Sequence, residues 1–328
     1  MNEKKKKKTG LFNILFSGIL LALFLIFLVG VFLWQNRRPE LPGPTETSES
    51  QSQTVQTDPT EPTQMPTEAT QPPAAPRRVN FLLVGRDWHS EGENGRSDTM
   101  ILCSMDTGAK TVKMVSFLRD LYLPIPGHGS SRLNASYSWG GAELLKQTLD
   151  QNFGVTVDVN LEIDFDGFET MIDYLGGVDI TLTDREAAYL NRNYGWTLTE
   201  GPTHLDGEQA LAYSRIRHID SDFVRTLRQQ NVLTALLERF RTATLQEVLS
   251  TLDLFLDQST SNLTDEELLV LMLELYPMLK DSALTGHQVP ADGTYSYATI
   301  RGMSVIEADL DANRAILAQL LPQAEQNQ

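Results

Sequence analysis

The chain has few of the residues from which enzymes build metal or redox centres. Of its 328 residues one is cysteine, Cys103, which excludes an intrachain disulfide and any CxxC metal or redox motif. Five scattered histidines form no HExxH pair, so a zinc hydrolase of that type is not favoured. There is no GxxxxGK[ST] phosphate loop and no protein-kinase signature, so nothing indicates a nucleoside triphosphate as substrate.

Positive charge is also scarce. The formal net charge is -16. Five lysines and one glutamate in residues 1–10, together with Arg37 and Arg38, supply +6, so residues 39–328 carry -22. Nucleic-acid binding needs a broad basic surface, so this chain is expected to bind no nucleic acid.

The N-terminal region has the pattern of a membrane anchor. Lys4–Lys8 precede residues 11–34, which are 24 residues without a charge. As a helix this run is about 36 Å long, enough to cross a bilayer with some tilt. A cleaved signal peptide is the alternative, but its apolar core is normally shorter and no small-x-small cleavage site follows. We therefore predict one transmembrane helix in the cell membrane, with the basic tail 1–10 in the cytoplasm and the chain after Arg38 outside.

The next segment, residues 35–77, is predicted to be a disordered linker. Nine of residues 39–76 are proline, and Thr, Glu, Gln and Ser supply most of the rest. Such a segment buries too little apolar surface to offset the entropy of ordering it. Its proline content favours an extended tether with a reach on the order of 100 Å. Residues 78–328 are then a single extracellular globular domain.

Strands and helices alternate along that domain. Short apolar runs bounded by turn residues predict strands at 79–85, 98–105, 111–117, 155–164, 178–182 and 295–300. Helical spacing of apolar residues predicts helices at 141–153, 223–241, 245–256, 264–279 and 307–321, and capping patterns predict further helix starts at Asp166, Thr183 and Asp206. The interleaving predicts an α/β fold with a mixed central sheet covered by helices.

Two aspartates flank the loop after the first predicted strand. Asp87 ends that strand and Asp98 begins the next. If the two strands are antiparallel neighbours, both carboxylates lie at the same end of the sheet. Two carboxylates with open positions are how Mg²⁺ is usually held when a substrate phosphate completes its shell. The alternative is that both are ordinary turn and cap residues.

Three arginines also fall at the ends of predicted elements. Arg96 precedes the second strand, Arg119 follows the third, and Arg132 follows a loop rich in Pro and Gly. Each alone is typical of a surface ion pair that contributes little. Their recurrence beside a candidate metal site indicates convergence on one polyanion.

Four more arginines lie in one short stretch late in the domain. Arg215 and Arg217 alternate, so in an extended segment they project to the same side. Arg225, Arg228 and Gln229 share a face if that segment is helical. A solvated helix face paired to nearby acids is the alternative. Together with the other arginines and Mg²⁺, the stretch indicates a phosphoryl-transfer site.

Two apolar sets allow two interpretations. Phe165, Phe168, Met171 and Leu175 form the first, and residues 268–279 form the second. Both are most simply core. A long lipid chain lying between such helices and the sheet is the alternative, and the apolar pattern is compatible with either.

Several separated motifs resemble one known family. They are FLLVGRD (81–87), GRSDTMILCSMD (95–106), SFLRDLYLPIPG (116–127), RLNASYSWGGAELLKQTL (132–149), DFDGFETMIDYLGGVDI (164–180), HLDGEQALAYSRIRH (204–218), DFVRTLRQQNVL (222–233) and GMSVIEADLDANRAIL (302–317). In this order they resemble the LytR-CpsA-Psr family of membrane-anchored glycopolymer transferases. The resemblance covers about residues 79–322.

The resemblance implies a reaction and a set of site residues. The expected protein is a Mg²⁺-dependent phosphotransferase, with Mn²⁺ as a substitute. It moves an anionic glycopolymer, of teichoic acid or capsule type, from undecaprenyl pyrophosphate to peptidoglycan at the bilayer. The family's metal ligands match Asp87 and Asp98, and catalysis is assigned to these two and Arg119. The family's pyrophosphate-binding set matches Arg96, Arg119, Arg132, Arg217, Arg225 and Gln229, with Arg215 and Arg228 close by.

The chain departs from the family pattern in three places. Leu118 stands where proline is usual, Arg132 replaces a common lysine, and Val224 follows Phe223 where a glycine is often found. No departure removes a charged group, but the choice between Arg215 and Arg217 as phosphate ligand stays open. Two other functions also stay open: a binding module for polyprenyl pyrophosphates or wall polymer, and a lipid pyrophosphatase acting on the same donor.

Overall fold

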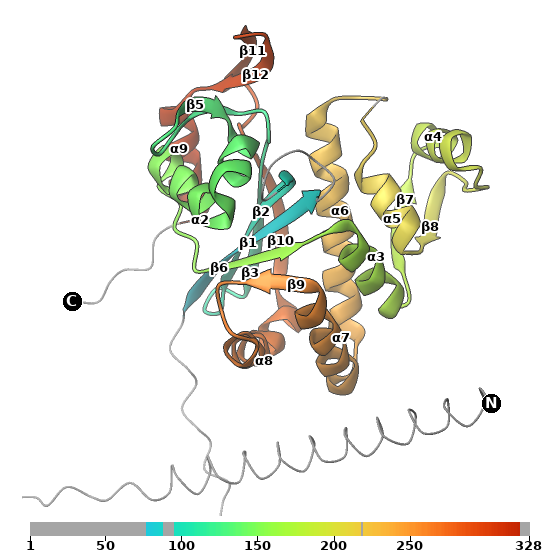
Figure 1. Ribbon diagram of the computed structural model, residues 1–328. Coiled ribbons are helices and arrows are strands. Elements are labelled where there is room, and N and C mark those ends of the chain that lie inside the picture. Colours follow the sequence, from blue (N-terminus) through green and yellow to red (C-terminus); the bar gives the residue numbers. More distant parts are fainter. Residues whose placement is uncertain (1–76, 88–94, 218, 322–328) are drawn as a thin grey trace, which may run out of the picture. The chain divides into compact units, whose positions relative to one another are not determined.

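The structure is a computed structural model that describes residues 77–87, 95–217 and 219–321 (Figure 1). The predicted tail 1–10, the transmembrane helix 11–34 and the linker up to residue 76 lie outside the described residues. Within the ranges that are described, no helix combines the length and the apolar character needed to cross a bilayer.

A six-stranded mixed sheet lies at the centre of the domain (Figure 1). Its strands, in spatial order, are β10 (Ala283–Val289), β3 (Thr111–Phe117), β2 (Arg96–Asp106), β1 (Arg78–Asp87), β6 (Val159–Ile163) and β9 (Ser259–Ser261). β1, β2 and β3 run antiparallel to one another, whereas β6 is parallel to β1 and β10 is parallel to β3. The α/β fold with a mixed central sheet covered by helices is therefore confirmed.

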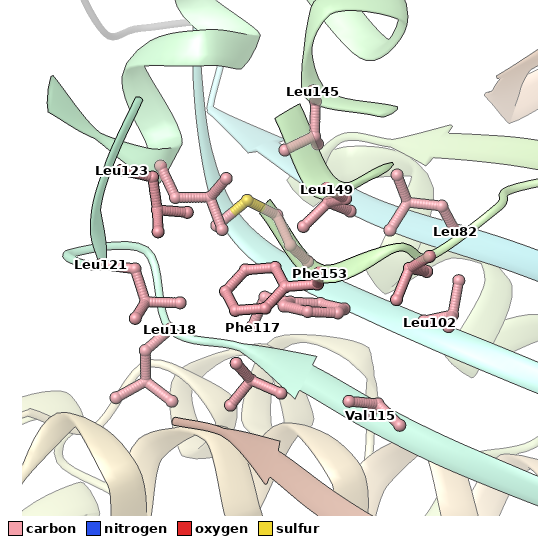
Figure 2. Packing of buried hydrophobic residues seen from close by; sticks show 14 of the residues in the cluster. Leu82, Leu102, Val115, Phe117, Leu118, Leu121, Leu123, Leu145, Leu149 and Phe153 are labelled. Atoms are coloured by element: carbon pink, nitrogen blue, oxygen red, sulfur yellow. The ribbon is translucent and has the colours of Figure 1, made fainter. Parts of the chain in front are cut away.

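Both faces of this sheet are buried. On one face Leu82, Leu102 and Val115 pack against α2 (Leu133–Phe153) and α9 (Leu310–Leu320), and Figure 2 shows part of this cluster. On the other face alternate residues of the same strands pack against α6 (Asp222–Thr242), α7 (Leu245–Gln258) and α8 (Asp265–Asp281). Two-sided burial explains why these strands are near-continuous apolar runs.

A smaller unit packs beside the sheet against α6. It contains the hairpin of β7 (Val178–Leu182) and β8 (Gly201–Leu205) with α3 (Phe165–Tyr174), α4 (Asp184–Tyr194) and α5 (Gly207–Ser214). The capping boxes predicted at Thr183 and Asp206 form. Each side chain accepts from the backbone amide three residues on, and the backbone amide of Thr183 or Asp206 donates to the side chain of Glu186 or Gln209.

Two more hairpins lie at one end of the domain. They are β4 (Tyr122–Ile125) with β5 (Gly129–Arg132), and β11 (Tyr295–Ile300) with β12 (Met303–Ala308). The backbone amide of Ile306 donates to the Asp120 carbonyl at 2.9 Å, which joins the second hairpin to the loop after β3.

Four predicted boundaries are wrong. The capping residue of α3 is Asp164, whose side chain accepts from the Gly167 amide at 2.9 Å, so Asp166 lies in the first turn. Helix α2 begins at Leu133 rather than 141, because a non-helical break at Gly140 and Gly141 joins two helical pieces. β6 spans only the second half of 155–164, and α9 begins at Leu310 because residue 307 belongs to β12.

Candidate functional site

The predicted pair of aspartates lies at one end of β1 and β2. Asp87 pairs with Arg96 across the two antiparallel strands, while Gly85 pairs with Thr99. The register shift between them leaves Asp98 as an extra residue on β2. Such a bulge re-aims the side chain of the inserted residue and is common beside functional sites. The backbone thus brings the two predicted metal ligands together, although the Asp87 side chain is not among those described.

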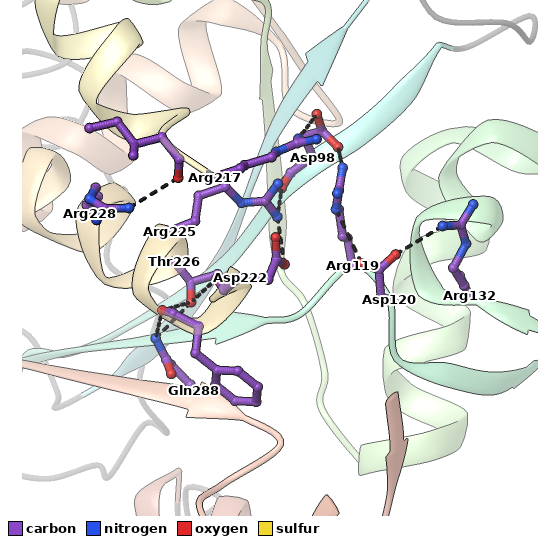
Figure 3. Close-up of polar contacts among 12 residues, drawn as sticks. Asp98, Arg119, Asp120, Arg132, Arg217, Asp222, Arg225, Thr226, Arg228 and Gln288 are labelled. Carbon is purple, nitrogen blue, oxygen red and sulfur yellow. Dashed lines mark hydrogen bonds and ion pairs between the residues drawn. The ribbon is translucent and has the colours of Figure 1, made fainter. Parts of the chain in front are cut away.

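Asp98 is the centre of an arginine cluster (Figure 3). Its Oδ1 accepts from Nη1 of Arg119 at 2.6 Å, and its Oδ2 accepts from Nη2 of Arg217 at 2.7 Å. Burial by itself raises the pKa of Asp98, but the charges of Arg119 and Arg217 outweigh it, so the pKa lies below its ordinary value. Asp98 is therefore a carboxylate at neutral pH.

Arg225, near the start of α6, lies next to Asp98. Its side chain is 1 % exposed. Its Nη2 donates to Oδ2 of Asp222 at 2.9 Å and to the backbone carbonyl of Asp98 at 3.4 Å. Burial disfavours the charged form of both side chains. It lowers the pKa of Arg225 to about 10 and raises the pKa of Asp222. Arg225 nevertheless keeps its charge at neutral pH.

A second carboxylate connects the cluster to the β4–β5 hairpin. Asp120 Oδ1 lies 3.2 Å from Nη1 of Arg132, and its Oδ2 lies 3.7 Å from Nε of Arg119. Arg132 is the residue before α2, so the short first piece of that helix fixes its backbone. The structure therefore brings Arg119 and Arg132 together, as predicted.

The remaining predicted arginines separate into three positions. Arg215 lies over the ring of Phe165, 4.3 Å from its centroid, and both residues line the cavity described below. Arg96 is exposed at the start of β2. Arg228 faces away from the cluster and pairs with Glu186 at 2.6 Å and with Asp220, so it shares no site with Arg225. For Arg228, which the resemblance placed only close to the pyrophosphate-binding set, the structure shows the alternative, a side chain paired to nearby acids.

A cavity of about 260 Å³ opens beside the arginine cluster, between the sheet and helices α3, α5, α6, α7 and α8. Most of its wall is apolar, including Phe165, Phe168 and Met171 from one of the predicted apolar sets. Its polar residues include Asp98, Arg215, Arg217, Arg225 and Gln229. The cavity therefore combines a long apolar wall with a cationic end.

Several buried polar atoms at that end lack a protein partner. Nε and Nη1 of Arg225 and Oε1 of Gln229 make no hydrogen bond with the described part of the chain. Leaving a buried donor unsatisfied costs about 1–3 kcal/mol, and more for a charged group. Such groups in a native fold call for an explanation, and a bound anion supplies acceptors for the guanidinium.

The charge balance at the cluster also favours an anionic ligand. Arg119, Arg132, Arg215, Arg217 and Arg225 supply five positive charges. Asp98, Asp120 and Asp222 supply three negative charges, and Asp164, which also lines the cavity, supplies a fourth, which leaves an excess of one among these described side chains. A group with two or more negative charges and several acceptor oxygens, such as a diphosphate, neutralises this excess.

The donor set at the strand ends fits a magnesium ion. The described part of the chain contains no group of three or more His, Cys, Asp or Glu side chains placed to hold a metal. Mg²⁺, however, is commonly bound by one or two carboxylates, with phosphate oxygens and water as the other ligands. Each Asp98 oxygen accepts one arginine N–H and keeps a lone pair, and the backbone of Asp87 ends the adjacent strand.

Sequence reasoning missed Asp120, Asp222 and the ring of Phe165. Asp222 could have been found, because it lies three residues before Arg225 on the predicted helix, the spacing of an ion pair. The contact between Arg215 and Phe165 joins residues fifty positions apart and leaves no local signal in the sequence.

The chain is similar to known proteins in sequence and in fold. The family model described as "LytR_cpsA_psr family" matches residues 44–320. Regulatory protein MsrR of Staphylococcus aureus (strain COL) is 38% identical over 162 residues, which are 48% of each chain. The polyisoprenyl-teichoic acid--peptidoglycan teichoic acid transferase TagT of Bacillus subtilis (strain 168) is 35% identical over 167 residues, 49% of this chain and 52% of TagT. The chain thus spans about half the length of the curated relatives it matches.

A solved structure shows the same fold with a ligand. The LytR-CPS2A-psr family protein YwtF (TagT) with bound octaprenyl pyrophosphate lipid superimposes with a TM-score of 0.59 at 25% identity. The superposition covers 74% of this chain and 89% of that one.

Proposed function

Because the chain belongs to the LytR_cpsA_psr family, we propose that its globular domain is a phosphotransferase acting in cell-wall assembly. The donor is an anionic glycopolymer, of teichoic acid or capsule type, linked to undecaprenyl pyrophosphate, and the acceptor is a hydroxyl of peptidoglycan. One observation carries the proposal: an apolar cavity ends at buried guanidinium groups of which Arg225 has two unpartnered nitrogens. The similarity to TagT, a polyisoprenyl-teichoic acid--peptidoglycan teichoic acid transferase, and to its structure with bound octaprenyl pyrophosphate lipid supports it.

The donor's two chemically different parts match the two parts of the cavity. The polyprenyl chain lies against the apolar wall, where burial stabilises it by about 25 cal/mol per Å². The diphosphate lies at the cationic end against Arg215, Arg217 and Arg225, where arginine donates paired hydrogen bonds to phosphate oxygens. Both Arg215 and Arg217 line the cavity, so we assign phosphate contacts to both.

We assign a Mg²⁺ site to Asp87 and Asp98. A bound Mg²⁺ would neutralise phosphate charge and orient the diphosphate. Binding can be measured without turnover by titrating Mn²⁺ as a paramagnetic probe in the presence of inorganic pyrophosphate. Asp98→Asn should weaken Mn²⁺ binding strongly, whereas Asp158→Asn, at a distant surface aspartate, should leave it unchanged. Equal binding in both variants would contradict the metal site.

The chain's own residues then supply charge stabilisation and proton transfer. As the acceptor oxygen bonds to the phosphorus next to the saccharide, the bond to the polyprenyl phosphate breaks. Arg119, Arg217 and Arg225 stabilise the charge that develops on that leaving phosphate. Asp98 is a weak proton acceptor, because its arginine partners hold its pKa low. Asp222, whose pKa is raised by burial, is the better acceptor for the hydroxyl proton among the described carboxylates of the cluster.

The predicted anchor fits this reaction. A transmembrane helix at 11–34 and a tether at 35–77 would hold the domain on the outer side of the cell membrane. A lipid-linked donor has its head group at the same surface, so anchoring raises the effective concentration of the donor at the domain.

The test is the identity of the products. The full-length chain, purified in mild detergent, is mixed with a polyprenyl-pyrophosphate-linked saccharide, a peptidoglycan oligosaccharide and Mg²⁺, and the products are analysed by mass spectrometry. We expect a saccharide joined to the glycan by a phosphodiester, lost when the metal is chelated. Free saccharide phosphate as the only product would indicate a pyrophosphatase instead. An intact, bound donor with no product would indicate a binding module.

A further inference from the structure

A row of aromatic side chains runs from the arginine cluster to the solvent. The ring of Phe223, the second residue of α6, stacks on Tyr295 of β11 with centroids 4.8 Å apart and an interplanar angle of 26°. Tyr295 in turn meets Tyr297 edge to face, with centroids 5.7 Å apart at 88°. Tyr297 is 65% exposed and is the most exposed large apolar side chain in the described part of the chain.

The row is held beside the site by backbone contacts. Phe223 directly follows Asp222, the ion-pair partner of Arg225. The β11–β12 hairpin is joined to the loop that carries Arg119 and Asp120 through the amide of Ile306.

The row and the apolar cavity lie on opposite sides of the cluster. Phe223 and Tyr295 pack against the core on the sheet face covered by α2 and α9. The cavity is bounded by residues of the other face, such as Leu83 and Ile101. In Figure 1 the hairpin projects beyond β5 and α2, away from α7 and α8. A diphosphate at the cluster with its lipid in the cavity therefore directs whatever it carries, or whatever attacks it, toward this row.

We propose that Tyr297 and Tyr295 form a saccharide subsite that binds one face of a hexopyranose ring, a proposal that rests on the function proposed above. The C–H groups on one face of such a ring carry partial positive charge and are attracted to the electron-rich face of an aromatic ring. A phenol also offers a hydroxyl to the sugar's own hydroxyls, which suits Tyr better than Phe at a wet surface.

The surroundings of Tyr297 fit a sugar better than a protein partner. The other exposed residues of the hairpin are polar or glycine: Ser296, Thr299, Arg301, Gly302, Ser304 and Glu307. Their hydroxyl, guanidinium and carboxylate groups can all hydrogen-bond to a saccharide. A protein interface would be expected to show a contiguous apolar patch of a few hundred Å². A single exposed ring among hydroxyl and charged side chains has the composition of a sugar platform.

Two sugars in the proposed reaction carry such rings, the donor's saccharide and the acceptor glycan. The experiment measures binding of two soluble probes to the full-length chain in detergent by saturation-transfer NMR and calorimetry. One probe is a peptidoglycan tetrasaccharide and the other is a disaccharide linked to farnesyl pyrophosphate. The variants are Tyr297→Ala and Tyr297→Phe, and the matched control is Tyr174→Ala on α3, a tyrosine that is 52% exposed.

We expect Tyr297→Ala to weaken binding of at least one probe by about 3- to 10-fold, the size of one lost ring contact. Tyr297→Phe should retain most of the affinity, and Tyr174→Ala should match the wild type. Weakening of the tetrasaccharide alone assigns the subsite to the acceptor, and weakening of the farnesyl-linked probe alone assigns it to the donor.

Three results would overturn the subsite. They are unchanged affinity for both probes in Tyr297→Ala, failure of the wild type to bind either saccharide, and an equal loss in Tyr174→Ala. Affinity for inorganic pyrophosphate, measured in parallel, is expected to stay unchanged in all three variants. The absence of pyrophosphate binding in the wild type would instead contradict the proposed function, so the two failures are distinguishable.

Discussion

Arg225 and Arg228 lie one turn apart on α6, are both almost fully buried, and have opposite surroundings. Arg228 is enclosed by Glu186 and Asp220 and donates to the carbonyl of Ile216 at 3.1 Å. Arg225 has one carboxylate partner and two nitrogens without a partner in the described part of the chain, and the residue lines the cavity. The first arginine has its interactions within the fold, whereas the second keeps donors available for a ligand.

This contrast gives a paired prediction for two substitutions. Arg225→Met should weaken binding of a polyprenyl pyrophosphate by about 10- to 100-fold, because two charge-assisted hydrogen bonds are lost. Arg228→Met should instead lower the free energy of unfolding by about 3–5 kcal/mol, because two carboxylates are left buried and unpaired. Urea unfolding and lipid-binding calorimetry on both variants separate the two effects.

Arg228→Met serves as the control for the loss of lipid binding in Arg225→Met. The folded fraction of Arg228→Met should bind the lipid with wild-type affinity, since that side chain does not reach the cavity. If Arg228→Met lost affinity while Arg225→Met kept it, the assignment of the two side chains would be reversed and the site would have to be redrawn.

At the residue scale, the sequence could predict which side chains gather but not how each is used. Turns of α6 place Arg228 and Gln229 about 60° and 40° to opposite sides of Arg225. Helical spacing alone therefore could not say which of the two faces the ligand. The choice is made by Glu186, which comes from α4, 42 residues away, and pairs with Arg228.

At the scale of elements, the kink in α2 matters most for the site. The first piece of the helix begins at Leu133, directly after Arg132, and the second covers the sheet with Leu145 and Leu149. Gly141 joins them at φ 61 and ψ -157, a backbone region that only glycine adopts readily. The kink lets one continuous segment both pack on the core and place Arg132 beside Asp120.

We therefore expect Gly141→Ala to lower the free energy of unfolding by about 1–3 kcal/mol through backbone strain. The comparison is Gly154→Ala, at the left-handed C-cap of the same helix with open space around it, which should cost only about 1 kcal/mol. Equal stability of Gly141→Ala and the wild type in urea would show that the kink is not strained.

Sequence patterns predicted some of these elements and missed others. Two-sided burial made β1, β2 and β3 readable as apolar runs, and the capping residues Thr183 and Asp206 marked helix starts correctly. The short hairpins β4–β5 and β7–β8 were not recognised in full, because strands of four or five residues with Pro and Gly resemble loops. β10 was missed because the polar or small residues Thr285, Gly286 and His287 interrupt any apolar run, and pairing with β3 supplies its stability.

For the whole molecule, the proposed ligand is long and has two chemically distinct ends, so the two ends should be separable by mutation. Leu237 on α6 lines the apolar part of the cavity. Leu237→Trp fills that space, and we expect it to weaken binding of a long-chain polyprenyl pyrophosphate by about 10-fold or more while inorganic pyrophosphate binds as before. Calorimetry with the two ligands tests this.

Leu227→Trp is the matched control, because Leu227 lies on the same helix but is 46% exposed to solvent. It should leave both affinities unchanged. A parallel loss of both ligands in Leu237→Trp would mean that the cavity's apolar part does not hold the lipid chain separately from the cationic end.

The transfer rate of Arg119→Ala tests the central claim most directly. Arg119 pairs with both Asp98 and Asp120, is partly exposed, and packs in no core cluster, so its removal should leave the fold intact. We expect transfer of saccharide phosphate to peptidoglycan oligosaccharide, followed by mass spectrometry, to fall by about 100-fold or more, with the melting temperature within a few degrees of the wild type. An unaltered rate in the folded variant would contradict the assignment of the arginine cluster as the site of transfer.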